Sequence, residues 1–211
     1  MKTILFDLDG TIIDSGPGII HCVRTAYRSL EEPVPEEAIL RTFVGPPLRE
    51  SFPKHGIPAQ KVETAVEIFR QEYQITGKYD VVPYPGISCL LSRLQQEGHR
   101  LMIATSKPES LALDILGRLG MDRFFERICG ATMGTERESK SDVIAYLLSQ
   151  VPALSEAIMV GDTHFDVLGA NAHGIRTIGV TWGYGEAQQM LDAGAAAVVS
   201  DMDALYRAIT G

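Results

Sequence analysis

The chain has 211 residues, of which 45% are hydrophobic and 22% charged, and this apolar fraction excludes a disordered protein. Such a length corresponds to one large domain, or to a core with a small second domain, and suffices to bury a core without disulfides. The 27 acidic residues outnumber the 19 basic ones, so the net charge of −8 makes nucleic acid and anionic membranes poor partners.

Along most of the chain, short apolar runs rich in strand-forming residues alternate with amphipathic stretches. Strands are predicted at residues 3–6, 100–104, 127–129, 157–160, 176–180 and 197–199. Helices are predicted at residues 90–97, 109–119, 142–150 and 165–173. This alternation is typical of βαβ units, so the sequence predicts an α/β fold in which helices flank a Rossmann-like parallel sheet.

One segment, residues 16–81, interrupts the alternation directly after the first predicted strand. It contains no convincing strand, and turn-rich sequences with Gly and Pro bracket it on both sides. Helical periodicity is visible over residues 19–30, 36–43 and 59–76. We therefore expect two domains, an α/β core of residues 1–15 and 82–211 and a small helical insert of residues 16–81.

The first predicted strand runs directly into Asp7-Leu8-Asp9-Gly10-Thr11. Carboxylates two residues apart project to the same side if the extended backbone continues, so Asp7 and Asp9 repel unless a proton or a cation lies between them. Gly10 allows a sharp turn after them. A polar turn is the structural alternative, but two acids within one turn are costly without a functional reason.

A second polar sequence, Thr105-Ser106-Lys107-Pro108, follows the strand predicted at 100–104. A hydroxyl at a strand end beside a helix N-terminus can donate to a phosphate oxygen, with backbone N–H groups assisting. Lys140, just before the helix predicted at 142–150, is a further candidate. Taken singly, Thr105 is an ordinary helix cap and Lys140 an ordinary surface lysine, so both depend on the other motifs.

The last motif, Gly161-Asp162-Thr163-His164-Phe165-Asp166, follows the strand predicted at 157–160. Two carboxylates four residues apart at a helix start suit a hard divalent cation. Helix capping explains Thr163 and Asp166 but not Asp162, a carboxylate directly after a hydrophobic strand. Because ligands of open α/β sheets bind at the carboxyl ends of strands, we expect the motifs to meet in one site there.

In this order, the motifs resemble those of the haloacid dehalogenase (HAD) superfamily, specifically its phosphatases with a helical cap inserted after the first strand. The resemblance covers nearly the whole chain. Val180-Thr181-Trp182-Gly183-Tyr184-Gly185 is similar to the phosphoglycolate phosphatase-like branch, as is Gly45-Pro46-Pro47-Leu48 in the insert. The sequence leaves open whether Trp182 and Tyr184 line the site entrance or only pack at its rim.

The resemblance implies a role for each matching residue. Asp7 would be the nucleophile that forms an aspartyl-phosphate, and Asp9 the general acid and then base. Thr105 would bond a phosphate oxygen, and Lys140 would neutralise Asp7 and the phosphoryl group. The implied Mg²⁺ residues are Asp7, Asp9 through its main-chain carbonyl, Asp162, and Asp166, which would orient a metal-bound water or Lys140. The candidate substrate-binding residues are Thr105, Ser106, Lys107, Gly45 and Arg49, although Arg49 is as well explained by a salt bridge.

The resulting hypothesis is a Mg²⁺-dependent phosphatase of a small phosphorylated metabolite, with phosphoglycolate as the first candidate. The alternatives are a sugar phosphomutase similar to β-phosphoglucomutase, a nucleotidase or a pyrophosphatase on the same fold. A retired module that only binds phosphometabolites is the non-enzymatic alternative, but the complete set of motif residues argues against it. We expect a monomer or homodimer.

The cysteines and the N-terminus predict the compartment. Cys22, Cys89 and Cys129 lie far apart, which favours buried thiols in a reducing environment over a disulfide framework or a zinc site. The first apolar run ends at Asp7, too early for a signal peptide, and later apolar runs are too short to span a bilayer. We therefore expect a cytoplasmic protein.

Overall fold

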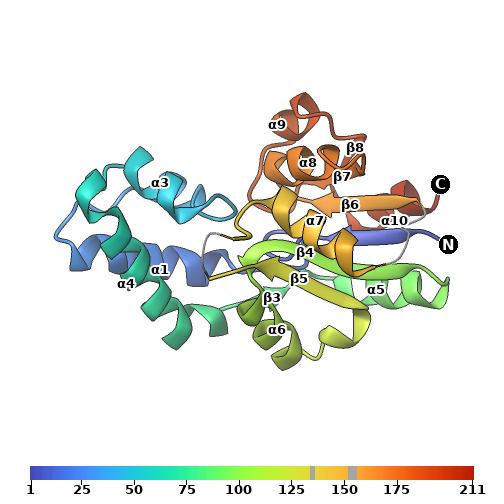
Figure 1. The fold of residues 1–211 in the computed structure, drawn as a ribbon, viewed down its shortest axis with the longest axis horizontal. Coiled ribbons are helices and arrows are strands. Elements are labelled where there is room, and N and C mark those ends of the chain that lie inside the picture. Colours follow the sequence, from blue (N-terminus) through green and yellow to red (C-terminus); the bar gives the residue numbers. More distant parts are fainter. Residues whose placement is uncertain (134–135, 152–155) are drawn as a thin grey trace. The chain divides into compact units, whose positions relative to one another are not determined.

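A six-stranded parallel sheet organises the larger part of this computed structural model, which describes residues 1–133, 136–151 and 156–211 (Figure 1). The strand order is β5-β4-β1-β6-β7-β8, and Leu5 of β1 pairs with Met102 on one side and Met159 on the other. The strands are β1 (Thr3–Phe6), β4 (Arg100–Pro108), β5 (Arg127–Ala131), β6 (Ala157–Gly161), β7 (Arg176–Val180) and β8 (Ala197–Val199). The predicted α/β fold with a parallel sheet is confirmed.

The order of the strands places a topological switch beside β1. The chain first adds β4 and β5 on one side of β1 and then returns to add β6, β7 and β8 on the other. All four residues of β1 are buried, as expected for a strand covered on both faces. The carboxyl ends of β4, β1 and β6 therefore lie at the switch point, where ligands of such sheets bind.

Helices cover both faces of the sheet. Helices α7 and α8 contact each other on one face, where Val143 and Ile144 pack against Leu5, Met102 and Met159. Helices α5 and α10 contact each other on the opposite face, and α5 and α6 both contact the short helix η3 (Asp122–Phe124). The helices of this unit are α5 (Ile87–Gln96), α6 (Glu109–Arg118), α7 (Lys140–Gln150), α8 (His164–Asn171), α9 (Ala187–Asp192) and α10 (Met202–Thr210).

Local capping explains where α7 begins. The Ser139 hydroxyl oxygen accepts from the Asp142 N–H at 3.1 Å, and an Asp142 carboxylate oxygen accepts from the Ser139 N–H at 3.1 Å. This capping box makes Lys140 the first residue of the helix, two residues earlier than predicted. Lys140 therefore lies in the first turn of α7, between Ser139 and Asp142, whose mutual hydrogen bonds hold the backbone there.

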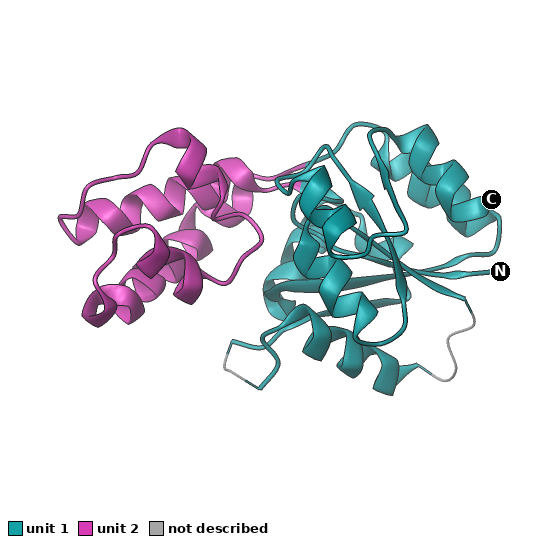
Figure 2. Cartoon of the chain, turned by 90° about the horizontal axis from the view of Figure 1, so that it is seen from above, with its two compact units in different colours: residues 1–13, 83–211 teal, residues 14–82 magenta. Residues whose placement is uncertain are grey.

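The chain divides into two compact units, one of Met1–Ile13 with Pro83–Gly211 and one of Asp14–Val82 (Figure 2). The second unit is helical, and the rings of Tyr27, Phe43 and Phe52 pack in its core with centroids 5.3–6.3 Å apart. Its elements are α1 (Gly16–Ser29), α2 (Glu37–Arg41), α3 (Leu48–Lys54), η1 (Ala59–Lys61), α4 (Val62–Ile75) and η2 (Gly77–Tyr79). Where the chain passes between the units, β2 (Ile13–Asp14) pairs with β3 (Val82–Pro83).

Among the described residues, no helix combines the length and the apolar character that crossing a membrane requires.

Candidate active site

The backbone of β1 carries Asp7 past the end of the strand without leaving the sheet. The Asp7 N–H donates to the Val160 carbonyl at 2.9 Å, so the pairing with β6 continues for one more residue. Because side chains alternate along extended backbone, Asp7 shares the face of Leu5, on which α7 packs. The Asp7 side chain is buried at this edge.

Lys140 lies between two of the predicted carboxylates. Its Nζ is 2.5 Å from Asp7 Oδ1 and 2.8 Å from Asp166 Oδ1, and it donates to the Ala104 carbonyl at 2.8 Å. A Cβ at Gly169 would lie 2.6 Å from Lys140 Cγ, so glycine in α8 makes room for the lysine stem. A buried lysine whose ammonium group has three oxygen partners is not an ordinary surface residue.

Asp162 and Asp166 complete an acidic cluster with Asp7. One carboxylate oxygen from each of the three lies within 4.8 Å of the others, a spacing that a single divalent cation can bridge. Asp166 Oδ2 also accepts from the Thr163 N–H at 3.0 Å and the Thr163 hydroxyl at 2.8 Å. A Cβ at Gly161 would lie 2.4 Å from Asp166 Cγ, so the glycine of the motif leaves space for that carboxyl group.

The electrostatics of the cluster favour a bound cation. With all three buried carboxylates ionised, the one positive charge of Lys140 would leave two negative charges to be offset by protons or by a cation. Burial raises the pKa of Asp7 to about 6 although Lys140 opposes the shift, and burial, with Asp166 and Asp7 nearby, holds the pKa of Asp162 well above its usual range. Burial lowers the pKa of Lys140, but Asp166 and Asp7 outweigh it, so Lys140 stays charged. An oxygen-only donor set of this charge fits Mg²⁺.

Asp9 faces a different partner. Among the described residues, the cluster that meets the metal-site spacing does not include it. Both Asp9 carboxylate oxygens instead accept from Lys107 Nζ, at 2.8 and 3.0 Å, and both side chains are largely buried. The sequence predicted Lys107 as a substrate-binding residue and gave no sign of this ion pair.

Lys107 lies in an irregular segment at the end of β4. The register with β5 shifts between Thr105 and Pro108, so the strand continues past its predicted end at residue 104. A Cβ at Gly130 of β5 would lie 2.5 Å from the Lys107 carbonyl oxygen, so glycine permits the close approach of the irregular segment. The Lys107 N–H donates to Thr105 Oγ1 at 3.1 Å, which leaves the proton of the Thr105 hydroxyl for another acceptor.

The other predicted substrate-binding residues lie in two places. Ser106 is half-buried beside Thr105 in β4. Gly45 and Arg49 belong to the helical unit, where Gly45 is exposed with a φ of 107°. The Arg49 guanidinium donates twice to the Glu63 carboxylate of α4, at 2.8 and 3.0 Å, so this arginine forms the salt bridge that was its alternative explanation.

Two further contacts to Asp162 come from Thr11 and Tyr184, for which the sequence predicted no contact with this carboxylate. The Thr11 hydroxyl donates to Asp162 Oδ1 at 3.3 Å, and the Tyr184 N–H donates to Oδ2 at 2.8 Å. Only the glycines beside Tyr184 signalled such an approach in the sequence, because they allow a loop to pass close to another chain segment.

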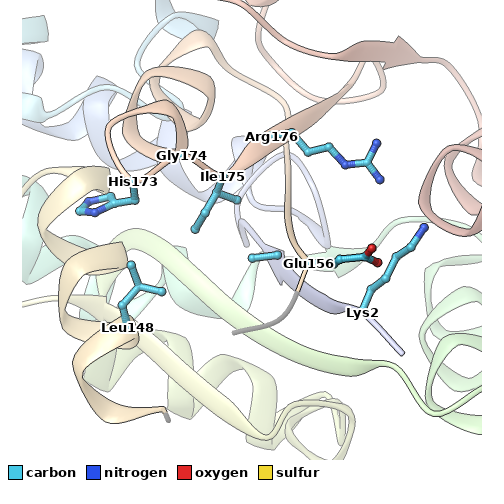
Figure 3. Close-up of a pocket in the computed structure, with 8 residues that line it drawn as sticks. Lys2, Leu148, Glu156, His173, Gly174, Ile175 and Arg176 are labelled. Atoms are coloured by element: carbon cyan, nitrogen blue, oxygen red, sulfur yellow. The ribbon is translucent and has the colours of Figure 1, made fainter. Parts of the chain in front are cut away.

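A cavity of about 640 Å³ lies at the opposite end of the sheet, where β1, β6 and β7 begin (Figure 3). Lys2, Glu156 and Arg176 contribute charged groups to its wall, and Lys2 Nζ donates to the Ile209 carbonyl at 2.7 Å. It contains none of the motif residues, so it does not compete with the acidic cluster as the candidate active site.

Comparison with known proteins places this geometry in a family. The sequence profile of haloacid dehalogenase-like hydrolases matches residues 4–180. A crystal structure described as a predicted phosphatase from Clostridium acetobutylicum superposes with a TM-score of 0.93 and 34% identity, covering 99% of this chain and 97% of that one.

Curated relatives carry different activities in their names. The tyrosine-protein kinase PtkA of Mycobacterium tuberculosis (strain ATCC 25618 / H37Rv) is 42% identical over 187 residues, which are 88% of this chain, and the chain spans 64% of its length. A 5'-nucleotidase of Pseudomonas aeruginosa is 37% identical over 189 residues, 89% of this chain and 86% of the relative. A phosphoglycolate phosphatase of Pseudomonas savastanoi pv. phaseolicola is 30% identical over 211 residues, which cover 95% of this chain and 77% of the relative.

Proposed function

The chain belongs to the haloacid dehalogenase-like hydrolase family, and we propose that it is a Mg²⁺-dependent phosphatase of a small organic phosphate monoester. The observation that carries this proposal is the position of Lys140 Nζ, 2.5 Å from Asp7 and 2.8 Å from Asp166 at the carboxyl edge of the sheet. A carboxylate nucleophile can approach a phosphate dianion only where cations offset the negative charge of both. Lys140 is one such cation in contact with Asp7.

Asp7 and Asp162 are the side chains that we propose as ligands of Mg²⁺, together with the main-chain carbonyl of Asp9. When bound, Mg²⁺ would offset negative charge on the phosphate and on the attacking carboxylate. Asp166 was predicted with the metal residues, but its oxygens already contact Lys140 and Thr163. This favours a role in orienting Lys140.

In the first half-reaction, an oxygen of Asp7 attacks phosphorus, and the bond from phosphorus to the leaving alcohol oxygen breaks. Asp9, in its protonated form, donates the proton that this oxygen needs and is left as the carboxylate that pairs with Lys107. In the second half-reaction, Asp9 accepts a proton from water while the water oxygen attacks phosphorus. The bond to Asp7 then breaks, which releases inorganic phosphate and restores the carboxylate.

Lys107 acts in this proposal by holding Asp9. The ion pair at 2.8 and 3.0 Å keeps the Asp9 carboxylate in one orientation at the end of β1. An oriented acid–base group needs less reorganisation to reach the leaving oxygen and, later, the water. Thr105 and Ser106 remain the proposed phosphate contacts, with the Thr105 hydroxyl proton available to a phosphate oxygen.

The helical unit Asp14–Val82 is the proposed cap that selects the substrate. Gly45 and Arg49 are its candidate substrate contacts. Since Glu63 already binds Arg49 through two hydrogen bonds, an anionic substrate would have to compete with this carboxylate. Phosphoglycolate remains a candidate substrate, and the identity of 37% to a 5'-nucleotidase makes nucleoside monophosphates an equal one.

A second candidate function is phosphoryl transfer to an acceptor other than water. The 42% identity to PtkA, a protein named as a tyrosine kinase, favours it. Both functions would share the phosphorylated Asp7 and differ in the acceptor that attacks it. Incubation with ATP and a tyrosine peptide, followed by detection of phosphotyrosine, distinguishes transfer from hydrolysis.

The proposed function is tested by phosphate release from para-nitrophenyl phosphate with Mg²⁺ and with EDTA. We expect turnover that requires Mg²⁺ and disappears in Asp7→Asn, whereas Asp122→Asn, an exposed acid in η3, retains it. A panel of phosphoglycolate, nucleoside monophosphates, pyrophosphate and β-glucose 1-phosphate then ranks substrates, and glucose 6-phosphate as product would identify a mutase. Turnover that persists in Asp7→Asn contradicts the proposal.

A further inference from the structure

Residues 182–185, which we call the Trp182 loop, follow β7 and pass close to Asp162. The sequence Trp182-Gly183-Tyr184-Gly185 alternates aromatic residues with glycines, and the loop is half-buried. The Tyr184 N–H donates to Asp162 Oδ2 at 2.8 Å. Through this contact a backbone group of the loop touches a proposed metal ligand.

The loop is also fastened to the segment after β1. The Trp182 indole N–H donates to the Thr11 carbonyl at 3.1 Å, and the Thr11 hydroxyl donates to Asp162 Oδ1 at 3.3 Å. Asp162, Tyr184, Trp182 and Thr11 thus form a closed ring of contacts. Because each Asp162 oxygen accepts one hydrogen bond from this ring, rotation of the carboxylate would break at least one of them.

The two glycines make this approach possible. A Cβ at Gly183 would lie 2.3 Å from Asp162 Oδ2 and 2.4 Å from the Gly10 carbonyl oxygen. A Cβ at Gly185 would lie 2.0 Å from the Asp162 carbonyl oxygen. No side chain fits at either distance, so the close packing of the Trp182 loop on Asp162 requires glycine at both positions.

We propose that the Trp182 loop is a positioning element of the metal site, which fixes the orientation of the Asp162 carboxylate and thereby sets the affinity for Mg²⁺. This inference rests on the proposed function, because it assumes that Asp162 is a metal ligand. Asp162 is 1% exposed, so water cannot replace the donors that the loop and Thr11 provide. Hydrogen bonds that orient ligands in this way are worth about 10–100-fold in metal affinity.

Calorimetric titration with Mg²⁺ tests the inference without relying on activity. We expect Gly183→Ala to raise the Kd for Mg²⁺ by about tenfold or more, since the added methyl must displace the loop or Asp162. Gly117→Ala is the matched control, because a Cβ there meets nothing within 4 Å and the residue lies inside α6. The control should keep the wild-type Kd.

A fold readout accompanies the titration. Trp182 is the only tryptophan in the sequence, so its emission in EDTA reports the packing of the loop in each glycine variant. Thr11→Val provides a second route if Gly183→Ala does not fold, because it removes the hydroxyl donor to Asp162 at nearly constant volume. We expect its Kd to rise by about threefold to tenfold.

The outcomes distinguish failure of the positioning role from failure of the proposed function. A wild-type Kd in folded Gly183→Ala, or in Thr11→Val if only that variant folds, overturns the positioning role while Mg²⁺ binding by the wild-type protein stands. If the wild-type protein binds no Mg²⁺, the proposed function fails and the inference fails with it. A weaker Kd in the variants with an unchanged Kd in Gly117→Ala supports the inference.

Discussion

Lowering the pH should weaken Mg²⁺ binding, because protons and the metal compete for the same buried carboxylates. The pKa of Asp7, about 6, means that this group is mostly protonated at pH 5 and mostly ionised at pH 7. For one competing proton, this difference changes the apparent Kd by about tenfold over that interval. The raised pKa of Asp162 also weakens Mg²⁺ binding at low pH, so the apparent Kd should change by at least about tenfold.

Calorimetry at pH 5 and pH 7, repeated in buffers of different ionisation enthalpy, measures both the Kd and the protons released. We expect tighter binding at pH 7 and proton release near pH 6. Asp7→Asn should bind Mg²⁺ more weakly and with a shallower pH dependence, since one competing proton is gone. A Kd that does not change with pH, or that falls at pH 5, would refute the electrostatic argument.

The same shift predicts how pH affects the metal-free fold. The pKa of Asp7 is raised from 3.8 to about 6 in the folded state, so the folded state binds more protons than the unfolded state between these values. In EDTA, the free energy of unfolding should therefore fall as the pH rises from about 4 to 6, by about 3 kcal/mol in total from this group. Urea unfolding at several pH values should show that the difference in unfolding free energy between Mg²⁺ and EDTA grows as the pH rises over this interval.

Three substitutions test the other charged residues. Lys140→Met should abolish turnover and cost about 3–5 kcal/mol in urea unfolding with EDTA, because it leaves buried carboxylates without their cation; unchanged stability would contradict the buried ion pairs. Asp9→Asn should lose most turnover but keep the calorimetric Mg²⁺ affinity, since only its main chain is a proposed ligand; wild-type turnover would refute the acid–base role. Lys107→Met should reduce phosphoenzyme formation from an alkyl phosphate by about a hundredfold but preserve the burst of nitrophenol from the aryl ester, whose leaving group needs no proton; equal losses would refute the positioning of Asp9.

The backbone positions of the site could be predicted because each motif directly follows a strand that the sequence pattern indicates. The strands at 3–6, 176–180 and 197–199 are confirmed to the residue, since each contains β-branched apolar residues and ends directly before a polar residue. The parallel order then brings the carboxyl ends together. Carboxylate oxygens of Asp7, Asp162 and Asp166 lie within 4.8 Å of one another for this topological reason.

Other features depended on local backbone geometry that a pattern does not encode. Lys107 pairs with Asp9 from the segment in which the register shifts after Thr105, and nothing in Thr-Ser-Lys-Pro indicates this irregularity. Helix α3 was missed because Pro53 lies inside it, and helix patterns normally end near proline. The hydrogen bond from Tyr184 to Asp162 comes from a backbone amide, which has no sequence signature of its own.

Rapid acid quench of the enzyme with a phosphate monoester and Mg²⁺ tests the central claim most directly, because it asks whether the phosphoryl group passes through Asp7. Mass spectrometry of the quenched protein should find one phosphoryl group on the peptide that contains Asp7, and more of it in Asp9→Asn if that variant still forms the intermediate. A phosphoryl group on any other residue, or substrate turnover with an unmodified Asp7 peptide throughout the first turnover, would contradict the account.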